Sequence, residues 1–193
     1  VTTEIITVFI VSYLSGSIPF GLILTKIFLN KDLRKIGSKN IGATNVLRTG
    51  NKTVAVLTLF LDISKGIIPI LITKQYFTDL IYLSSLAAFL GHIFPVWLKF
   101  KGGKGVATYL GIVFVLSLEL SIIFCIAWVL VSVITKYSSL SSILSTIIVF
   151  LFSFFNNNFE LTSYLFITFI IILYTHRQNI LRIKNKSEDK IKL

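Results

Sequence analysis

Few acidic residues and a single cysteine distinguish this sequence of 193 residues. Asp and Glu together number 8, and all charged residues make up 14%, against about 25% in an ordinary soluble domain. The lone Cys125 excludes an internal disulfide and a cysteine-based metal cluster. Hydrophobic residues reach 54% and the mean hydropathy is +0.86, which excludes a disordered chain and disfavours a soluble globular enzyme.

The charge that remains is unbalanced, because 19 Lys and Arg residues give a formal net charge of +11 at pH 7. On a chain that is mostly buried in a membrane, these residues must be crowded into a few loops, and such loops attract anions. Phosphorylated metabolites and anionic lipid head groups fit a membrane chain better than nucleic acid does. We therefore expect phosphate-bearing partners and membrane lipids, and no nucleic-acid partner.

Seven apolar stretches are long enough, or nearly long enough, to cross a membrane, for which about 20 residues are needed. They are Ile5–Thr25, Thr53–Thr73, Leu80–Leu98, Val106–Leu118, Leu120–Thr135, Leu140–Phe155 and Leu161–Thr175. The fourth and fifth are short and separated only by Glu119, so they could also form one bent helix. The first lacks a basic leading segment and a small-residue cleavage site, so we expect a retained helix.

The placement of charge favours a particular orientation. All basic residues except Lys65 and Lys74 fall in segments that share one side of the membrane if Val1 faces outward. The positive-inside bias then predicts an odd number of spans, with the amino end outside and the carboxyl end in the cytoplasm. We predict an all-α polytopic membrane bundle of about seven transmembrane helices. It should form a single domain over residues 1–193, because no repeat or linker divides the chain.

Three polar segments interrupt the apolar sequence on the predicted cytoplasmic side. The first is Gly37–Arg48, in which hydroxyls, amides and glycine backbone stand beside a guanidinium suited to bidentate phosphate binding. Its composition is equally typical of an ordinary turn. The second is Gly91–Thr108, where glycines surround Lys104 directly before a span and could form an anion nest. It is not a Walker A loop, because Gly105 follows the lysine. The alternative is an interfacial belt anchored by aromatic and basic side chains.

The third segment is His176-Arg177-Gln178-Asn179, which closes the last predicted span. His176 and Asn179 share a helical face at i and i+3, and the imidazole suits proton transfer or a phosphate hydrogen bond. A membrane-surface anchor is the plainer interpretation. Serines at 138, 139, 141 and 142 begin the sixth span and could bind substrate, cap the helix or allow close packing.

Two charges lie inside the second span, Asp62 and Lys65, at helical i, i+3 spacing. Charges within a membrane indicate function by default, but these two can also satisfy each other. The only cytoplasmic-side acids are Asp32, Glu188 and Asp189, too scattered for a two-metal site. We expect no metal or organic cofactor.

The segments together resemble one family. Ser-Gly-Ser-Ile-Pro-Phe-Gly stands at 15–21, Gly-Ser-x-Asn-Ile-Gly-Ala-Thr-Asn-Val-Leu-Arg at 37–48, Asp-x-x-Lys-Gly at 62–66, the segment described above at 91–108, and His-x-x-Asn-Ile at 176–180. This order is similar to that of the bacterial acyl-phosphate:glycerol-3-phosphate acyltransferases, the PlsY family. Lys39 and Thr175 depart from the family pattern without removing a reactive group. A metabolite carrier is the main alternative, disfavoured because no repeated halves are detectable.

The resemblance implies transfer of a fatty acyl group from acyl phosphate to the 1-hydroxyl of glycerol 3-phosphate, giving lysophosphatidic acid and phosphate. It implies catalytic roles for Ser38, Arg48, Lys104, His176 and Asn179, and substrate binding by Asn40, Thr44, Asn45, Gly102, Gly103, Ser139 and Ser142. Either His176 or a substrate phosphate would take the proton. We expect a monomer in the bacterial cytoplasmic (inner) membrane, with its active site facing the cytoplasm.

Overall fold

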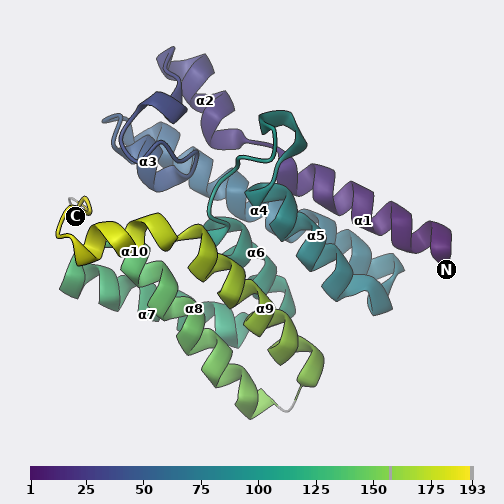
Figure 1. Ribbon diagram of the computed structural model, residues 1–193. Helices are drawn as coiled ribbons and strands as arrows, with labels where there is room; N and C mark the ends of the chain where they lie inside the picture. Colours follow the sequence, from purple (N-terminus) through teal and green to yellow (C-terminus); the bar gives the residue numbers. More distant parts are fainter. Residues whose placement is uncertain (157, 192–193) are drawn as a thin grey trace. The chain divides into compact units, whose positions relative to one another are not determined.

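The computed structural model describes residues 1–156 and 158–191, and within them every regular element is a helix (Figure 1). The prediction of an all-α chain is therefore confirmed for the described residues. The α-helices are α1 (Thr2–Ser17), α2 (Phe20–Leu29), α3 (Ala43–Leu47), α4 (Lys52–Tyr76), α5 (Ile81–Ile93), α6 (Val106–Leu116), α7 (Leu118–Thr135), α8 (Ser138–Ser153), α9 (Phe159–Thr175) and α10 (Arg177–Lys184). The 3-10 helices are η1 (Leu33–Lys35), η2 (Thr78–Leu80), η3 (Val96–Leu98) and η4 (Phe154–Asn156). Lys192, the last predicted cytoplasmic basic residue, lies outside the described residues.

The chain divides into two compact units, Val1–Val115 and Leu116–Leu193. In the part of the chain that the structure describes, four helical stretches are long and apolar enough to cross a membrane: Thr2–Leu29, Lys52–Tyr76, Thr78–Leu98 and Leu118–Thr135. Helices α9 and α10 meet the same criterion together but are bent by 55° where they join, and α6 and α8 are shorter apolar helices. The count of about seven spans, the orientation and the single domain stay predictions.

Two helix boundaries follow from local chemistry. The first predicted span is divided between α1 and α2 because Ile18 precedes Pro19, and a residue before proline is pushed out of the helical region; Ile18 is extended. The expected break at Glu119 falls two residues earlier, where the Ser117 hydroxyl accepts the Leu120 N–H and caps α7. The fourth and fifth predicted spans are therefore separate helices.

In the first unit, α1 and α5 lie side by side and run in the same direction (Figure 1). A Cβ added to Gly16 would lie 2.0 Å from the carbonyl oxygen of Ala88, and one added to Gly91 would lie 2.2 Å from that of Tyr13. The two backbones are thus in direct contact, as small residues allow between apolar helices. Gly66 and Gly111 allow a similar approach between α4 and α6.

The charges within the second predicted span form a buried ion pair. Asp62 Oδ1 lies 2.9 Å from Lys65 Nζ, and each side chain is only 3% exposed. Lys65 Nζ also donates to the carbonyl of Ile18, 2.7 Å away, at the break between α1 and α2. The lysine therefore joins α4 to a backbone group that the break leaves without a helical partner.

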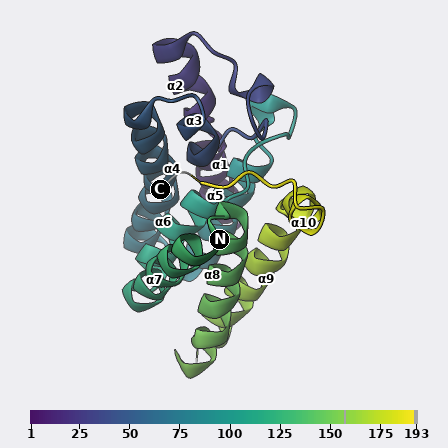
Figure 2. The ribbon, with the colours of Figure 1, turned by 90° about the vertical axis from the view of Figure 1, so that its left-hand side faces the viewer.

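The second unit contains α7, α8 and α9, with α10 turning away at the end of α9 (Figure 2). The turn at Lys136 and Tyr137 joins α7 to α8, and Ile191 N–H donates to the Lys136 carbonyl at 2.8 Å. The segment after α10 therefore returns to the α7–α8 turn.

We expect Lys65→Met to destabilise the protein by about 3–5 kcal/mol, because it leaves the buried Asp62 carboxylate without its cation. Thermal unfolding in detergent micelles measures the loss. The double variant Asp62→Asn/Lys65→Met should recover part of it, and Ser64→Ala, on a half-buried serine of the same helix, serves as the control. A Lys65→Met melting temperature equal to that of the control would contradict the assigned pairing.

Candidate functional site

The loop Gly37–Arg48 is organised from within by Asn45. Its buried amide nitrogen donates to the carbonyls of Leu33 (3.2 Å), Ile36 (2.9 Å) and Asn40 (2.8 Å). Its oxygen accepts the Ser38 N–H at 3.0 Å. Both ends of the amide are used by backbone groups, so the geometry gives Asn45 a loop-holding role instead of the substrate contact that the sequence suggested.

The other candidates of this loop surround Asn45. Ser38 and Asn40 are half-buried, and Thr44 and Arg48 are exposed. The Asn40 side-chain oxygen accepts the Gly42 N–H at 3.0 Å. A Cβ added to Gly37 would lie 3.0 Å from Arg48 Cδ, so the arginine stem crosses the glycine backbone. The loop thus brings Ser38, Asn40, Asn45 and Arg48 together.

An apolar cluster beneath this loop joins it to the segment that follows α5. Its buried members are Leu24, Leu33, Ile41, Val46, Val54 and Ala55. Leu98 of η3 packs against the same cluster, and Trp97 Nε1 donates to Ser17 Oγ at 2.8 Å. The predicted first and second polar segments therefore contact each other through apolar packing.

The glycines before Lys104 pack onto the end of α5. Gly102 N–H donates to the Ile93 carbonyl at 3.0 Å, and Gly103 N–H donates to the His92 carbonyl at 3.1 Å. These amides were expected to face a phosphate, but they complete the C-terminal end of a helix, whose last carbonyls need donors. Lys104 is half-buried shortly before α6, and its phosphate role stays a prediction.

In the second unit, Glu188 joins two predicted site residues. Its Oε1 accepts from Ser139 Oγ at 2.7 Å and from Asn179 Nδ2 at 2.6 Å, while Oε2 accepts from Arg182 Nε at 2.7 Å. The sequence analysis set this glutamate aside as a scattered acid. The available signal was its place between basic residues, since Arg182, Lys184 and Lys186 precede it and Lys190 follows.

Hydrogen bonding raises the acidity of Glu188. Burial by itself would raise the pKa of this carboxyl, but the hydrogen bonds from Asn179, Ser139 and Arg182 stabilise the ionised form more and lower its pKa.

In the first unit the Arg34 guanidinium hydrogen-bonds Asp32 and holds the pKa of that carboxyl at about 2. Arg34 is therefore paired outside the Gly37–Arg48 loop.

The hydrogen bonding of His176 defines the tautomer of its neutral ring. The ring is buried, and its Nδ1 lies 2.8 Å from the Ile172 carbonyl oxygen. Because a carbonyl can only accept, Nδ1 carries a proton, and the lone pair of the neutral ring is on Nε2.

The predicted substrate-binding residue Ser142 uses its hydroxyl within the second unit. Its Oγ donates to the Ser138 carbonyl at 2.9 Å and accepts from Trp128 Nε1 at 3.2 Å.

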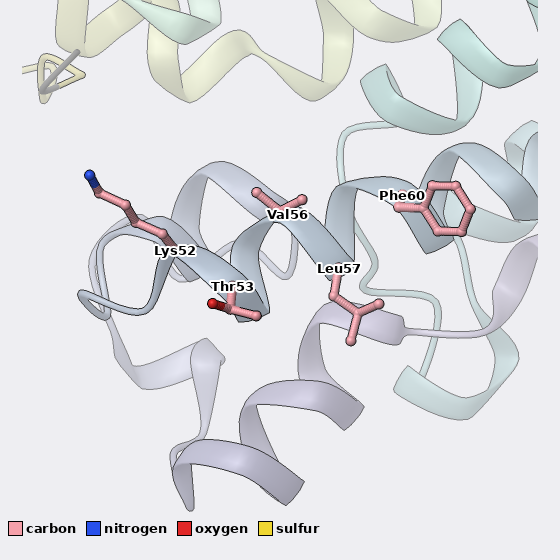
Figure 3. A pocket seen from close by; sticks show the side chains of 5 residues that line it. All are labelled: Lys52, Thr53, Val56, Leu57 and Phe60. Carbon is pink, nitrogen blue, oxygen red and sulfur yellow. The ribbon is translucent and has the colours of Figure 1, made fainter.

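The candidates thus form two groups, one in each unit. Ser38, Asn40, Thr44, Asn45, Arg48, Gly102, Gly103 and Lys104 belong to Val1–Val115, and Ser139, Ser142, His176 and Asn179 belong to Leu116–Leu193. A shallow surface hollow also lies on the first turns of α4, lined by Lys52, Thr53, Val56, Leu57 and Phe60 (Figure 3). Along α4, Lys52 comes first and the apolar side chains of Val56, Leu57 and Phe60 come after it.

Comparison with known proteins identifies the chain's family. The model of the glycerol-3-phosphate acyltransferase family matches residues 6–186. A glycerol-3-phosphate acyltransferase of Pelagibacter ubique is 54% identical over 190 residues, covering 98% of this chain and 99% of its own. One from Bartonella henselae is 50% identical over 191 residues, covering 95% and 90%.

Two solved structures have the same fold. The crystal structure of PlsY, an integral membrane glycerol 3-phosphate acyltransferase, in its glycerol 3-phosphate form is 39% identical, with a TM-score of 0.93 over 98% of this chain and 96% of that one. Its lysophosphatidic acid form is 38% identical, with a TM-score of 0.90 and the same coverage. The class is therefore that of integral membrane acyltransferases. This chain belongs to the glycerol-3-phosphate acyltransferase family.

We expect Asn45→Asp to disrupt the Gly37–Arg48 loop although the side chain keeps its shape. A carboxylate oxygen would face the carbonyls that the amide nitrogen now binds, and a buried group without its partner costs about 1–3 kcal/mol. Thermal unfolding should show this loss, and acyltransferase activity should fall with it. Asn30→Asp, at an exposed helix end, is the matched control; equal stability of the two variants would argue against the assigned hydrogen bonds.

Glu188 should make stability depend on pH. Its pKa is lower in the folded protein than its ordinary value of 4.5, so the ionised carboxylate contributes stability above that value, and the contribution is lost as pH falls through the folded pKa. Melting temperatures of wild type and Glu188→Gln should therefore differ most above pH 5 and converge as the pH falls through the folded pKa. Glu160→Gln, on the exposed start of α9, is the control. A constant difference across this range would exclude the linkage.

Proposed function

We propose that this protein transfers a fatty acyl group from acyl phosphate to the 1-hydroxyl of glycerol 3-phosphate, forming lysophosphatidic acid for phospholipid synthesis. Its family membership supports glycerol 3-phosphate as acceptor, and the glycerol 3-phosphate and lysophosphatidic acid forms of PlsY support the substrate and product. The observation that carries the proposal is the Gly37–Arg48 loop. Asn45 holds its backbone from inside, while the exposed Arg48 offers a planar fork at its surface that suits a phosphate.

The acyl phosphate requires little activation, because it is a mixed anhydride with phosphate as leaving group. The substrate hydroxyl oxygen attacks the acyl carbon, the bond from that carbon to the phosphate oxygen breaks, and the hydroxyl proton must be accepted. The tautomer of His176, with its lone pair on Nε2, supports this ring as the acceptor over a substrate phosphate. In this mechanism Arg48, Ser38 and Lys104 hold phosphate groups, and Asn179 orients the hydroxyl.

The membrane supplies the second substrate. We place the chain in the bacterial cytoplasmic membrane as a monomeric single domain with about seven spans, the amino end outside and the polar loops in the cytoplasm. The distribution of basic residues supports this orientation. The hollow along α4 (Figure 3) fits an acyl chain, because Val56, Leu57 and Phe60 follow Lys52 along the helix axis.

The test is lysophosphatidic acid formation by the purified protein, with palmitoyl phosphate and palmitoyl-CoA offered separately. We expect product from the acyl phosphate alone. Arg48→Ala should lower kcat/KM about 100-fold, in line with loss of one charge-stabilising donor. Arg34→Ala is the matched control, because that guanidinium is bound to Asp32 and lies outside the loop.

His176→Ala should abolish turnover while the protein stays folded. Product from the CoA ester alone would overturn the donor, and no product from either donor would overturn the proposed reaction. Near-normal kcat in His176→Ala would exclude the imidazole as the proton acceptor.

A further inference from the structure

A histidine that the proposed reaction does not use lies directly under the glycine loop. His92, near the end of α5, is 4% exposed. A Cβ added to Gly103 would lie 2.1 Å from His92 Nε2 and 2.8 Å from Cε1, so the ring edge rests against the glycine backbone. Gly103 N–H also donates to the His92 carbonyl at 3.1 Å. Gly103 therefore contacts both the backbone and the ring of one residue.

The other edge of the imidazole faces the buried ion pair. His92 Nδ1 lies 3.8 Å from Asp62 Oδ1, which lies 2.9 Å from Lys65 Nζ. That nitrogen in turn donates to the Ile18 carbonyl. Among the described residues, His92 Nδ1 has no hydrogen-bond partner although it is buried. A series of polar groups thus extends from the end of α1, through α4 and α5, to the glycine loop.

Close contacts also hold the other glycines of the Gly102–Gly105 loop against α5. A Cβ on Gly102 would lie 2.2 Å from the His92 carbonyl oxygen, and one on Gly105 would lie 2.5 Å from the Phe89 ring. Lys104 lies between Gly102 and Gly105 in the sequence, so its backbone position depends on the α5 residues that these two glycines contact. The ring of His92 forms part of that surface.

From this geometry we propose that His92 is a positioning residue for acyl transfer: its imidazole, backed by Asp62 and Lys65, sets the position of the Gly102–Gly105 loop and so of the Lys104 ammonium. The inference rests on the proposed function, in which Lys104 holds a phosphate. Burying the polar atoms of an imidazole costs free energy, and an apolar side chain could fill the same volume without that cost. His92 instead connects the loop to the ion pair, and gives the Asp-x-x-Lys-Gly and Ser-Gly-Ser-Ile-Pro motifs a role at the site.

A double-mutant cycle tests the contact between the ring and the loop. Gly103→Ala places a methyl group against His92 Nε2, and we expect kcat/KM to fall at least tenfold. His92→Asn removes that ring edge and should raise the KM of at least one phosphate substrate about tenfold, with kcat within twofold, because ground and transition states lose the same phosphate contact. The double variant should match His92→Asn alone, since the methyl group then has space.

The control separates positioning from general stability. Ser84 lies in α5, the same helix as His92, and Ser84→Ala removes its buried hydrogen bond to Ser12 of α1. It should lower the melting temperature but leave both KM values unchanged. If His92→Asn also changed only the melting temperature, or if the losses in the double variant simply multiplied, the positioning role would be overturned.

Binding measurements keep this inference distinct from the proposed reaction. If the wild type forms no lysophosphatidic acid from any acyl donor, the proposed function fails. Calorimetric titration with glycerol 3-phosphate and with inorganic phosphate then decides the role of His92. Weaker binding of either anion to His92→Asn than to Ser84→Ala supports the inference, and equal affinities for both anions overturn it.

Discussion

Backbone carbonyls that leave a helix inside an apolar protein need a donor, because lipid cannot supply one. This constraint explains three polar side chains of the first unit. Where α1 stops before Pro19, the Ile18 carbonyl accepts from Lys65 Nζ as well as from the Phe20 N–H. Asn45 supplies donors for three carbonyls of the 33–40 segment, and Tyr13 donates to the Phe94 carbonyl after α5. Polar side chains thus bind backbone carbonyls where the chain leaves its apolar helices.

The same constraint decides what glycine does in this fold. Gly16 and Gly91 bring the backbones of α1 and α5 into contact, and Gly102 and Gly103 bring a loop onto the end of α5. In each pair a side chain would meet a carbonyl or a ring. The glycines of the second polar segment therefore act by packing, and the charge of Lys104 is the part of the segment that can act on a ligand.

Much of the fold could be predicted from hydropathy, because a membrane span is a matter of length and apolar content. The prediction Thr53–Thr73 lies within α4, and Leu161–Thr175 lies within α9. The division of the first span was missed, since its apolar composition continues across Pro19. The polar loops were also located, because charged side chains are costly in lipid.

The direction in which side chains point was harder to predict than their location. Asn45 stands among plausible phosphate ligands in the sequence, yet the carbonyls that use its amide come from residues up to twelve positions earlier. Glu188 was set aside as one of three scattered acids, and its partner Ser139 lies 49 positions earlier in the sequence. Residue type identifies the chemistry that a segment can perform, whereas long-range hydrogen bonds decide which members perform it.

The position of Glu188 in the chain also bears on the order in which the protein is built. Its carboxylate joins Ser139 to Asn179, but the ribosome makes it after both of them. While α9 and α10 emerge, the hydroxyl and the amide therefore exist without the acceptor that later joins them. The second unit acquires its final local arrangement only when the segment beyond α10 has been synthesised, so a nascent chain halted at α10 would present these groups to water or lipid head groups instead.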